Sequence, residues 1–172
     1  MNVANTVLVL GASGLIGSAC VRRLRAAGYE TILMPSHSEL DLLNFGLVKA
    51  YFSSNNIDIV VLAAGKVGGI LENKLKPFDF ISENLRIQLN VCEAANQSSA
   101  RKVVMLGSSC MYPKITTQPM PVSSILGGHM EDTSLPYAIS KLAGLNLGLA
   151  FNRQSGKQKY IALIPNSAYG PG

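Results

Sequence analysis

Short apolar runs alternate along the chain with longer segments whose apolar residues recur at helical spacing. The runs are rich in β-branched residues and have no polar alternation, which is typical of strands buried on both faces of a parallel sheet. We expect strands at 6–10, 31–34, 57–64, 103–106 and 160–164, and helices at 14–27, 47–52, 79–96 and 134–151. The alternation predicts an α/β fold: a doubly wound parallel sheet with right-handed crossovers, helices on both faces and the first strand in the centre.

The length favours one domain that spans residues 1–172, with no internal repeat and no low-complexity linker. One irregular stretch, 110–133, is long for a compact domain and contains three prolines and the pair Gly127-Gly128. Loops of that length are more often functional than idle.

Composition narrows the class of protein. Apolar residues make up 48% and charged residues 15%, and no apolar run approaches the ~20 residues of a membrane span. The first residues have no basic segment before the glycine motif, so we expect a soluble cytoplasmic protein without membrane contact. The net charge of +5 favours anionic ligands such as nucleotides, but Lys and Arg are scattered without interleaved aromatics, so we expect no nucleic-acid partner.

Cysteine and histidine positions predict neither a disulfide scaffold nor a metal site. Cys20 and Cys92 fall in helical patterns, where we expect them to serve as small buried apolar residues. His37 and His129 have no second ligand at metal-binding spacing, so we expect no metal.

A glycine motif, GxxGxxG, follows the first expected strand and opens a helix at Gly11, Gly14 and Gly17. Glycine has no Cβ to keep a pyrophosphate from the backbone, and a helix N-terminus supplies unpaired N–H donors and positive dipole charge. The alternative is a turn needed only for tight packing of the strand and the helix. The strand-turn-helix context favours a dinucleotide site.

Tyr137 and Lys141 lie one helical turn apart at the start of an expected helix, in a YxxxK arrangement. A phenol with a pKa of about 10 is a weak acid-base catalyst near neutral pH, and a neighbouring ammonium lowers that value. The alternative is a chance pair on a solvated helix face. The glycine motif upstream favours catalysis.

The segment 106–113 follows the strand at 103–106, so its side chains should lie at the carboxyl edge of the sheet. The Ser108 hydroxyl can hydrogen-bond a substrate carbonyl there, and the Cys110 thiol can act as an acid or base. A small buried residue at a strand end is the alternative for Cys110.

Together these motifs resemble the extended short-chain dehydrogenase/reductases, and most closely their GDP-L-fucose synthase family of epimerase-reductases. The resemblance covers the whole chain and rests on the segments 11–17, 63–70, 84–85, 106–114, 136–144 and 169–171. KVGGI at 66–70 and GSSCMYPK at 107–114 are its most diagnostic parts. This family implies an NADP-dependent enzyme that converts GDP-4-keto-6-deoxy-D-mannose to GDP-L-fucose.

The resemblance implies roles for particular residues. Tyr137 would protonate the O4 alkoxide, with Ser108 and Lys141 as its reductase partners, and Cys110 would be the base of epimerisation. The implied cofactor site comprises Gly11, Ser13, Gly14, Leu15, Ile16, Gly17, His37, Ala63, Ala64, Gly65, Tyr137, Lys141 and Pro165.

The chain also departs from the family. It ends before the histidine that would be the acid partner of Cys110, and His129 does not match that position. The substrate domain is absent, so we expect negligible turnover and an exposed apolar face where that part would pack. Ser13 and His37 stand where basic residues would contact a 2′-phosphate; we favour NADP over NAD.

Several alternatives follow from this chain length. The chain could be another extended short-chain epimerase, dehydratase or reductase of nucleotide sugars, or a catalytically idle nucleotide-binding module. Related enzymes pair through long helices, here 79–96 and 134–151, so we expect a homodimer.

Overall fold

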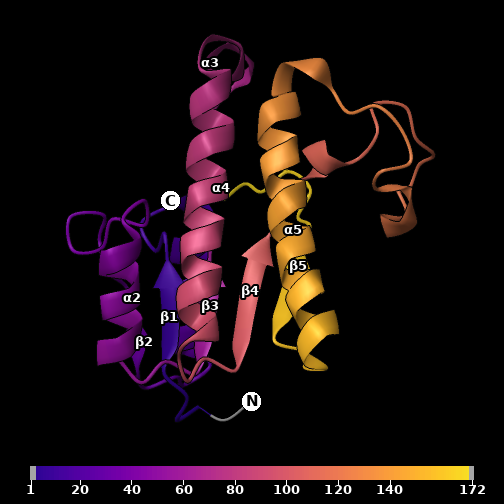
Figure 1. The fold of residues 1–172 in the computed structure, drawn as a ribbon. Coiled ribbons are helices and arrows are strands. Elements are labelled where there is room, and N and C mark those ends of the chain that lie inside the picture. The colour runs from indigo at the N-terminus through magenta and orange to yellow at the C-terminus, as the bar shows by residue number, and fades with distance from the viewer. Residues whose placement is uncertain (1–2, 171–172) are drawn as a thin grey trace.

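The computed structural model describes residues 3–170 and contains one parallel sheet of five strands (Figure 1). The strands run in the order β2-β1-β3-β4-β5, and each pairs in parallel with its neighbours. Their bounds are β1 Val7–Leu10, β2 Ile32–Leu33, β3 Ile59–Leu62, β4 Lys102–Leu106 and β5 Tyr160–Leu163. The expected parallel α/β sheet is confirmed, but the expectation that the first strand is central is wrong. Only β2 lies outside β1, whereas two strands follow β3, so β3 holds the centre.

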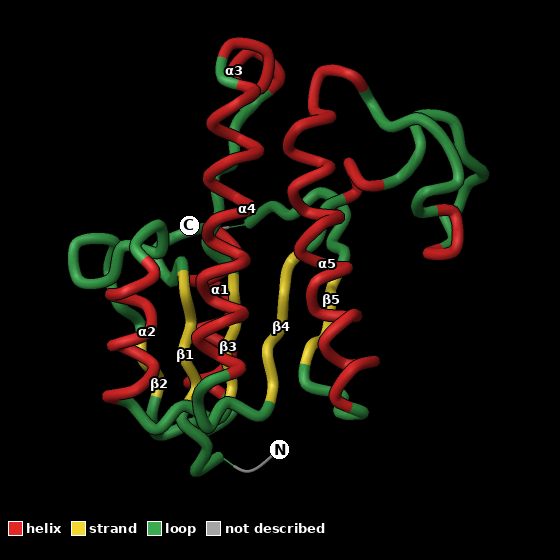
Figure 2. Tube along the Cα trace, viewed as in Figure 1, coloured by secondary structure: helices red, strands yellow, loops and turns green. Residues whose placement is uncertain are grey.

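Among residues 3–170, five α-helices connect the strands: α1 Leu15–Ala26, α2 Phe45–Ser54, α3 Ile70–Leu75, α4 Pro77–Asn96 and α5 Leu135–Ser155. The sequence pattern does not predict α3, which has six residues and is separated from α4 by Lys76 alone. The irregular stretch 110–133 projects from the body (Figure 2) and includes turns of 3-10 helix at Ser109–Met111, Val122–Ser124 and Asp132–Ser134.

The helices divide unequally between the two faces of the sheet. The larger core joins Leu8 and Val60 to Phe52 of α2 and Val91 of α4. The smaller core joins the alternate strand residues to α1, through Val21. Right-handed crossovers require this division, because the chain moves one way from β1 to β2 and the opposite way in every later crossover. The expected helices on both faces are therefore confirmed, with α1 alone on one of them.

Close packing between α4 and α5 fixes the helix that carries the YxxxK pair. A Cβ on Gly144 would lie 1.8 Å from Oε1 of Gln88, so the two helices touch at this point. Gln88 Nε2 donates to the carbonyl of Ser140 at 2.9 Å. Because a buried amide must find hydrogen-bond partners, this contact sets the register of α5 against α4.

The cysteines differ in burial. Cys92 is buried, as expected, but Cys20 is only partly buried, because its side of α1 faces away from the small core. The cysteines are free thiols, and no group of His, Cys, Asp and Glu among the described residues could hold a metal ion. Within residues 3–170, no helix combines the length and apolar character that a membrane span requires.

Candidate functional site

The glycine motif forms a tight turn between β1 and α1. Gly11 has a φ of +83°, and a Cβ there would lie 2.6 Å from the backbone nitrogen of Ala64. A Cβ on Gly17 would lie 2.0 Å from the carbonyl oxygen of Gly11. Gly14 caps α1 without a side-chain hydrogen bond, and α1 has no acidic residue in its first turn. The N-terminus of α1 therefore presents backbone N–H donors and the positive end of the helix dipole. The adjacent glycines have no Cβ atoms, so a pyrophosphate can approach the backbone closely.

A cavity of about 570 Å³ lies over this turn at the carboxyl ends of β1, β2 and β3. It brings together nine of the residues expected at the cofactor site: Gly11, Ser13, Gly14, Leu15, Ile16, His37, Ala63, Ala64 and Gly65. Open α/β sheets bind ligands at this edge, where the strand order reverses. The volume falls within the range typical of small-molecule pockets.

The other four expected cofactor residues lie outside the lining. Gly17 is buried beneath the turn, and Pro165 follows β5 without reaching the cavity. Tyr137 and Lys141 lie beyond Gly65, where a Cβ would stand 3.3 Å from Lys141 Nζ. Glycine at this position thus lets the cavity adjoin the Lys141 ammonium.

Asn84 of α4 fixes the segment after β3 and was not among the expected site residues. Its side chain is buried, accepts from the backbone N–H of Lys66 at 3.0 Å and donates to the carbonyls of Lys66 and Phe80. The sequence does hold a signal for it, because Asn84 and Gln88 fall on the apolar face of the expected helix, where a polar residue must have a partner. Asn84 holds the floor of the cavity in place.

An ion pair closes one wall of the cavity. Lys66 Nζ lies 2.9 Å from Oε1 of Glu83, and both side chains are partly exposed. The hydrogen bond to Glu83 raises the pKa of the Lys66 ammonium above its ordinary value. Neither partner was expected at the site, because a pair 17 residues apart depends on how α4 packs beside the segment after β3.

Ser108, Tyr137 and Lys141 converge at the carboxyl end of β4. Lys141 Nζ lies 5.7 Å from the centre of the Tyr137 ring, and Phe80 packs edge-on against that ring at 6.3 Å. Burial raises the pKa of the Tyr137 phenol, a hydrogen bond with Ser108 acts to lower it, and the Cys110 thiol beside it acts to raise it. The expected catalytic residues are thus neighbours in the structure. The phenol pKa is raised overall, however, and not lowered as expected beside an ammonium, because burial dominates.

The pKa of the Lys141 ammonium, the cation of this cluster, is strongly shifted from its ordinary value. Its side chain is 7% exposed, and burial lowers its pKa to about 8. Among the described residues, no carboxylate forms an ion pair with it. An ammonium kept near its titration point beside a phenol is suited to hold and release charge during proton transfer.

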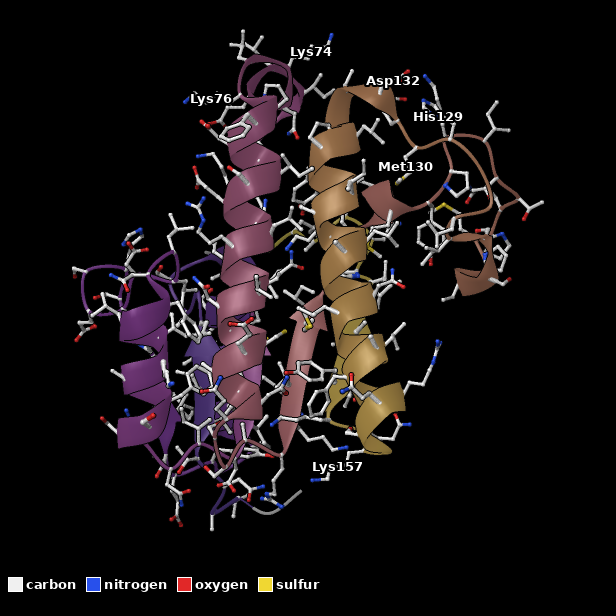
Figure 3. The ribbon with its side chains drawn as sticks, in the orientation of Figure 1. Lys74, Lys76, His129, Met130, Asp132 and Lys157 are labelled. Carbon is white, nitrogen blue, oxygen red and sulfur yellow. The ribbon has the colours of Figure 1, made fainter. Side chains whose placement is uncertain are left out.

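Cys110 lies in the short turn that follows β4, partly buried beside Tyr137. Its backbone N–H donates to Ser108 Oγ at 3.3 Å, so the two side chains share one turn. His129 lies elsewhere: its Nε2 is 2.7 Å from Oδ1 of Asp132, and Figure 3 shows both where the loop leads into α5. The structure therefore does not bring His129 to Cys110.

The fold and the cavity define a Rossmann-like α/β domain with its site at the carboxyl edge of the sheet. The chain belongs to the NAD dependent epimerase/dehydratase family, whose model matches residues 7–172.

Among curated relatives, this chain is 44% identical to GDP-L-fucose synthase of Escherichia coli (strain K12), over 96% of this chain and 51% of that protein. It is 45% identical to probable GDP-L-fucose synthase 1 of Oryza sativa subsp. japonica, over 96% of this chain and 50% of that protein. A solved structure of MlghC, a GDP-mannoheptose C4 reductase from Campylobacter jejuni with NADP bound, superposes with a TM-score of 0.94 at 29% identity, covering 98% of this chain and 53% of that one. The chain thus spans about half the length of the curated relatives it matches.

Proposed function

We propose that this chain is the cofactor-binding half of a GDP-L-fucose synthase, an NADP-dependent enzyme that epimerises and reduces GDP-4-keto-6-deoxy-D-mannose. One observation carries the proposal: the cavity over the glycine turn opens beside a cluster of Ser108, Tyr137 and the buried Lys141 that also includes Cys110. Two curated relatives that match nearly all of this chain at 44% and 45% identity bear that enzyme name.

The cofactor would lie with its pyrophosphate on the N-terminus of α1 and its nicotinamide toward Gly65. When bound, it would supply hydride to a ketone carbon. Tyr137 donates its phenolic proton to the developing alkoxide oxygen and becomes a phenolate. The Lys141 ammonium stabilises that phenolate, and Ser108 holds the carbonyl oxygen by a hydrogen bond.

Epimerisation needs a base that removes a proton from the carbon next to the ketone. Cys110 would take that proton, since its turn also holds the Ser108 hydroxyl that would bind the ketone oxygen. The enolate oxygen would receive the same hydrogen bonds that later serve reduction. One oxygen site therefore supports both reactions.

A reductase without epimerisation is the second candidate, because the MlghC structure is a GDP-mannoheptose C4 reductase by name. Such an enzyme would use Ser108, Tyr137 and Lys141 but would not need Cys110. Cys110→Ser separates the two in a fusion of this chain with the unmatched half of the Escherichia coli relative. Loss of epimerisation with reduction intact supports the synthase, whereas equal rates for both reactions in variant and parent would refute it.

Cofactor binding is tested on the 172-residue protein itself. We expect NADPH to bind with enhanced nicotinamide fluorescence, and Gly14→Val to abolish binding because its side chain would occupy the pyrophosphate position. Binding that survives this change would place the cofactor elsewhere. If neither NADPH nor NADH binds a natively folded chain, a catalytically idle module is favoured.

We also propose that two copies of this chain form a homodimer. Side chains with 36–45% exposure line the outer faces of the paired helices α4 and α5, and they are apolar: Leu85, Leu89, Ile139 and Leu147. A second copy would bury them. Sedimentation should detect a dimer that Leu89→Lys dissociates, and a monomeric parent would contradict this assignment.

A further inference from the structure

The cavity over the glycine turn extends to the segment after β2, where residues 35–37 line it. In dinucleotide folds, the group about 20 residues past the glycine motif contacts the adenosine ribose: a carboxylate binds a 2′-hydroxyl, and a nearby arginine binds a 2′-phosphate. Met34 stands at that distance from Gly14 and is neither. Among the described residues, Lys66 is the one Lys or Arg that lines the cavity, but it follows β3 and pairs with Glu83.

The hydrogen-bond donors of Ser36 in this segment are already used. Its backbone N–H and its hydroxyl both donate to Oε2 of Glu39, each at 2.7 Å. Pro35 has no N–H, and His37 supplies an imidazole without a fixed charge. The Glu39 carboxylate would also repel a phosphate. A 2′-phosphate at the end of β2 therefore needs a cation from another element.

Arg25 of α1 extends its side chain to this point. Its Nη2 lies 3.8 Å from Sδ of Met34, and Met34 directly precedes Pro35 in the cavity wall. A thioether is a weak acceptor. Within residues 3–170, Arg25 takes part in no ion pair. The guanidinium therefore lies beside the end of β2 with its charge unpaired.

We infer that Arg25 is the residue that recognises the 2′-phosphate of NADPH in this chain. The inference rests on the proposed function, because it takes the adenosine half of the cofactor to lie along the end of β2. A guanidinium presents a planar pair of N–H donors to phosphate oxygens and is always charged. On binding, it would exchange the Met34 thioether for the phosphate. NADH has a hydroxyl at this position, so Arg25 would favour NADPH over NADH.

The position of Arg25 allows a second explanation for its charge. It lies in the last turn of α1, where the negative end of the helix dipole favours a cation whatever the ligand. Arg23 lies in the same turn but lines a different pocket, beside Leu15 and Cys20. Arg23→Met is therefore the matched control, because it removes the same charge from the same turn and leaves the contact with Met34 intact.

Calorimetry on the 172-residue chain tests the inference with four ligands: NADPH, NADH, 2′,5′-ADP and 5′-ADP. The last two carry the adenosine end without the nicotinamide. We expect Arg25→Met to weaken NADPH and 2′,5′-ADP by about tenfold, and NADH and 5′-ADP by less than about twofold. Arg25→Lys should lose less, because it keeps the charge without the planar fork. Arg23→Met should change all four affinities by less than about twofold.

Three results would overturn the role of Arg25. Equal weakening of NADPH and NADH by Arg25→Met would indicate damage to the fold, which acts on both cofactors. An equal loss of NADPH affinity in Arg23→Met and Arg25→Met would indicate an effect of net charge alone. Unchanged NADPH affinity in Arg25→Met would show that the guanidinium does not contact the phosphate.

These ligands also separate the role of Arg25 from the proposed function. A parent chain that binds NADH and 5′-ADP, together with an Arg25→Met variant of unchanged NADPH affinity, would overturn the role of Arg25 alone. A natively folded parent that binds none of the four ligands would refute the cofactor site and Arg25 with it. Raising KCl from about 50 to about 300 mM should reduce the preference of the parent for NADPH, because salt screens an exposed ion pair, and should leave that of Arg25→Met nearly unchanged.

Discussion

Replacing Lys141 by methionine should stabilise the protein at neutral pH while it removes the proposed catalytic ammonium. The Lys141 side chain is 7% exposed, and its pKa falls from 10.5 to about 8 because burial penalises the charged form. That shift corresponds to roughly 3 kcal/mol of unfavourable interaction for the ammonium in the folded state. Methionine has a similar length and no charge, so it avoids this cost and keeps most of the packing.

The sign of the pH dependence follows from proton linkage. Between pH 8 and 10.5 the unfolded chain binds a proton at Lys141 that the folded chain has lost, so raising the pH through this window stabilises the parent relative to the methionine variant. We therefore expect Lys141→Met to gain up to about 3 kcal/mol at pH 7 and much less at pH 10.

Urea unfolding of parent and variant at pH 7 and pH 10 measures this difference, since other titrating groups are common to both proteins. Lys74→Met is the control, because Lys74 is exposed on α3 and should show no pH-dependent gain. A gain of equal size at both pH values, or a loss of stability at pH 7, would refute the argument that burial of the Lys141 ammonium is costly.

Three further changes test the glycine turn, the adenosine end of the cavity and its floor. Gly17→Ala should lower the melting temperature and weaken NADPH binding by more than tenfold, because the new Cβ would lie 2.0 Å from the Gly11 carbonyl oxygen. Gly69→Ala is the control and should change neither, because a Cβ at that position meets no atom within 4 Å. His37→Arg should tighten NADPH by about tenfold and leave NADH unchanged, because a guanidinium pairs with the 2′-phosphate; calorimetry with both cofactors checks it, and equal tightening would contradict it. Asn84→Ala should cost about 1–3 kcal/mol in urea unfolding by leaving buried backbone groups of Lys66 unpaired, and a neutral effect would argue against its role.

The order of strands and helices could be predicted from the sequence because each buried strand is a short apolar run, and each long helix repeats its apolar residues near every fourth position. The first strand was wrongly expected in the centre, because position in the sheet depends on how many strands are added on each side. The helix α3 was missed because six residues hold too few turns to show a period. Cys20 was expected to be buried, but α1 faces the sheet on one side only.

The convergence of the candidate site was also predictable. Gly11, Ser108 and Tyr137 each follow or face a strand end, and the carboxyl ends of parallel strands meet at one edge. The Lys66–Glu83 pair and the hydrogen bonds of Asn84 could not be predicted, since they depend on the position of α4 beside the segment after β3. The spacing of these residues along the chain does not indicate how close Lys66 lies to α4.

We expect cofactor binding and turnover to be separable, because they would depend on different parts of the fold. The cavity and the cluster of Ser108, Tyr137 and Lys141 lie over the large core beneath α2, α4 and α5. There, Asn84 and Gln88 fix the backbone by buried hydrogen bonds. The side chains of Ile161 and Leu163 face the other side of the sheet, so packing against them changes stability without moving the Lys141 ammonium. We therefore expect the 172-residue protein to bind NADPH, to be stabilised by Lys141→Met and to reduce no ketone sugar.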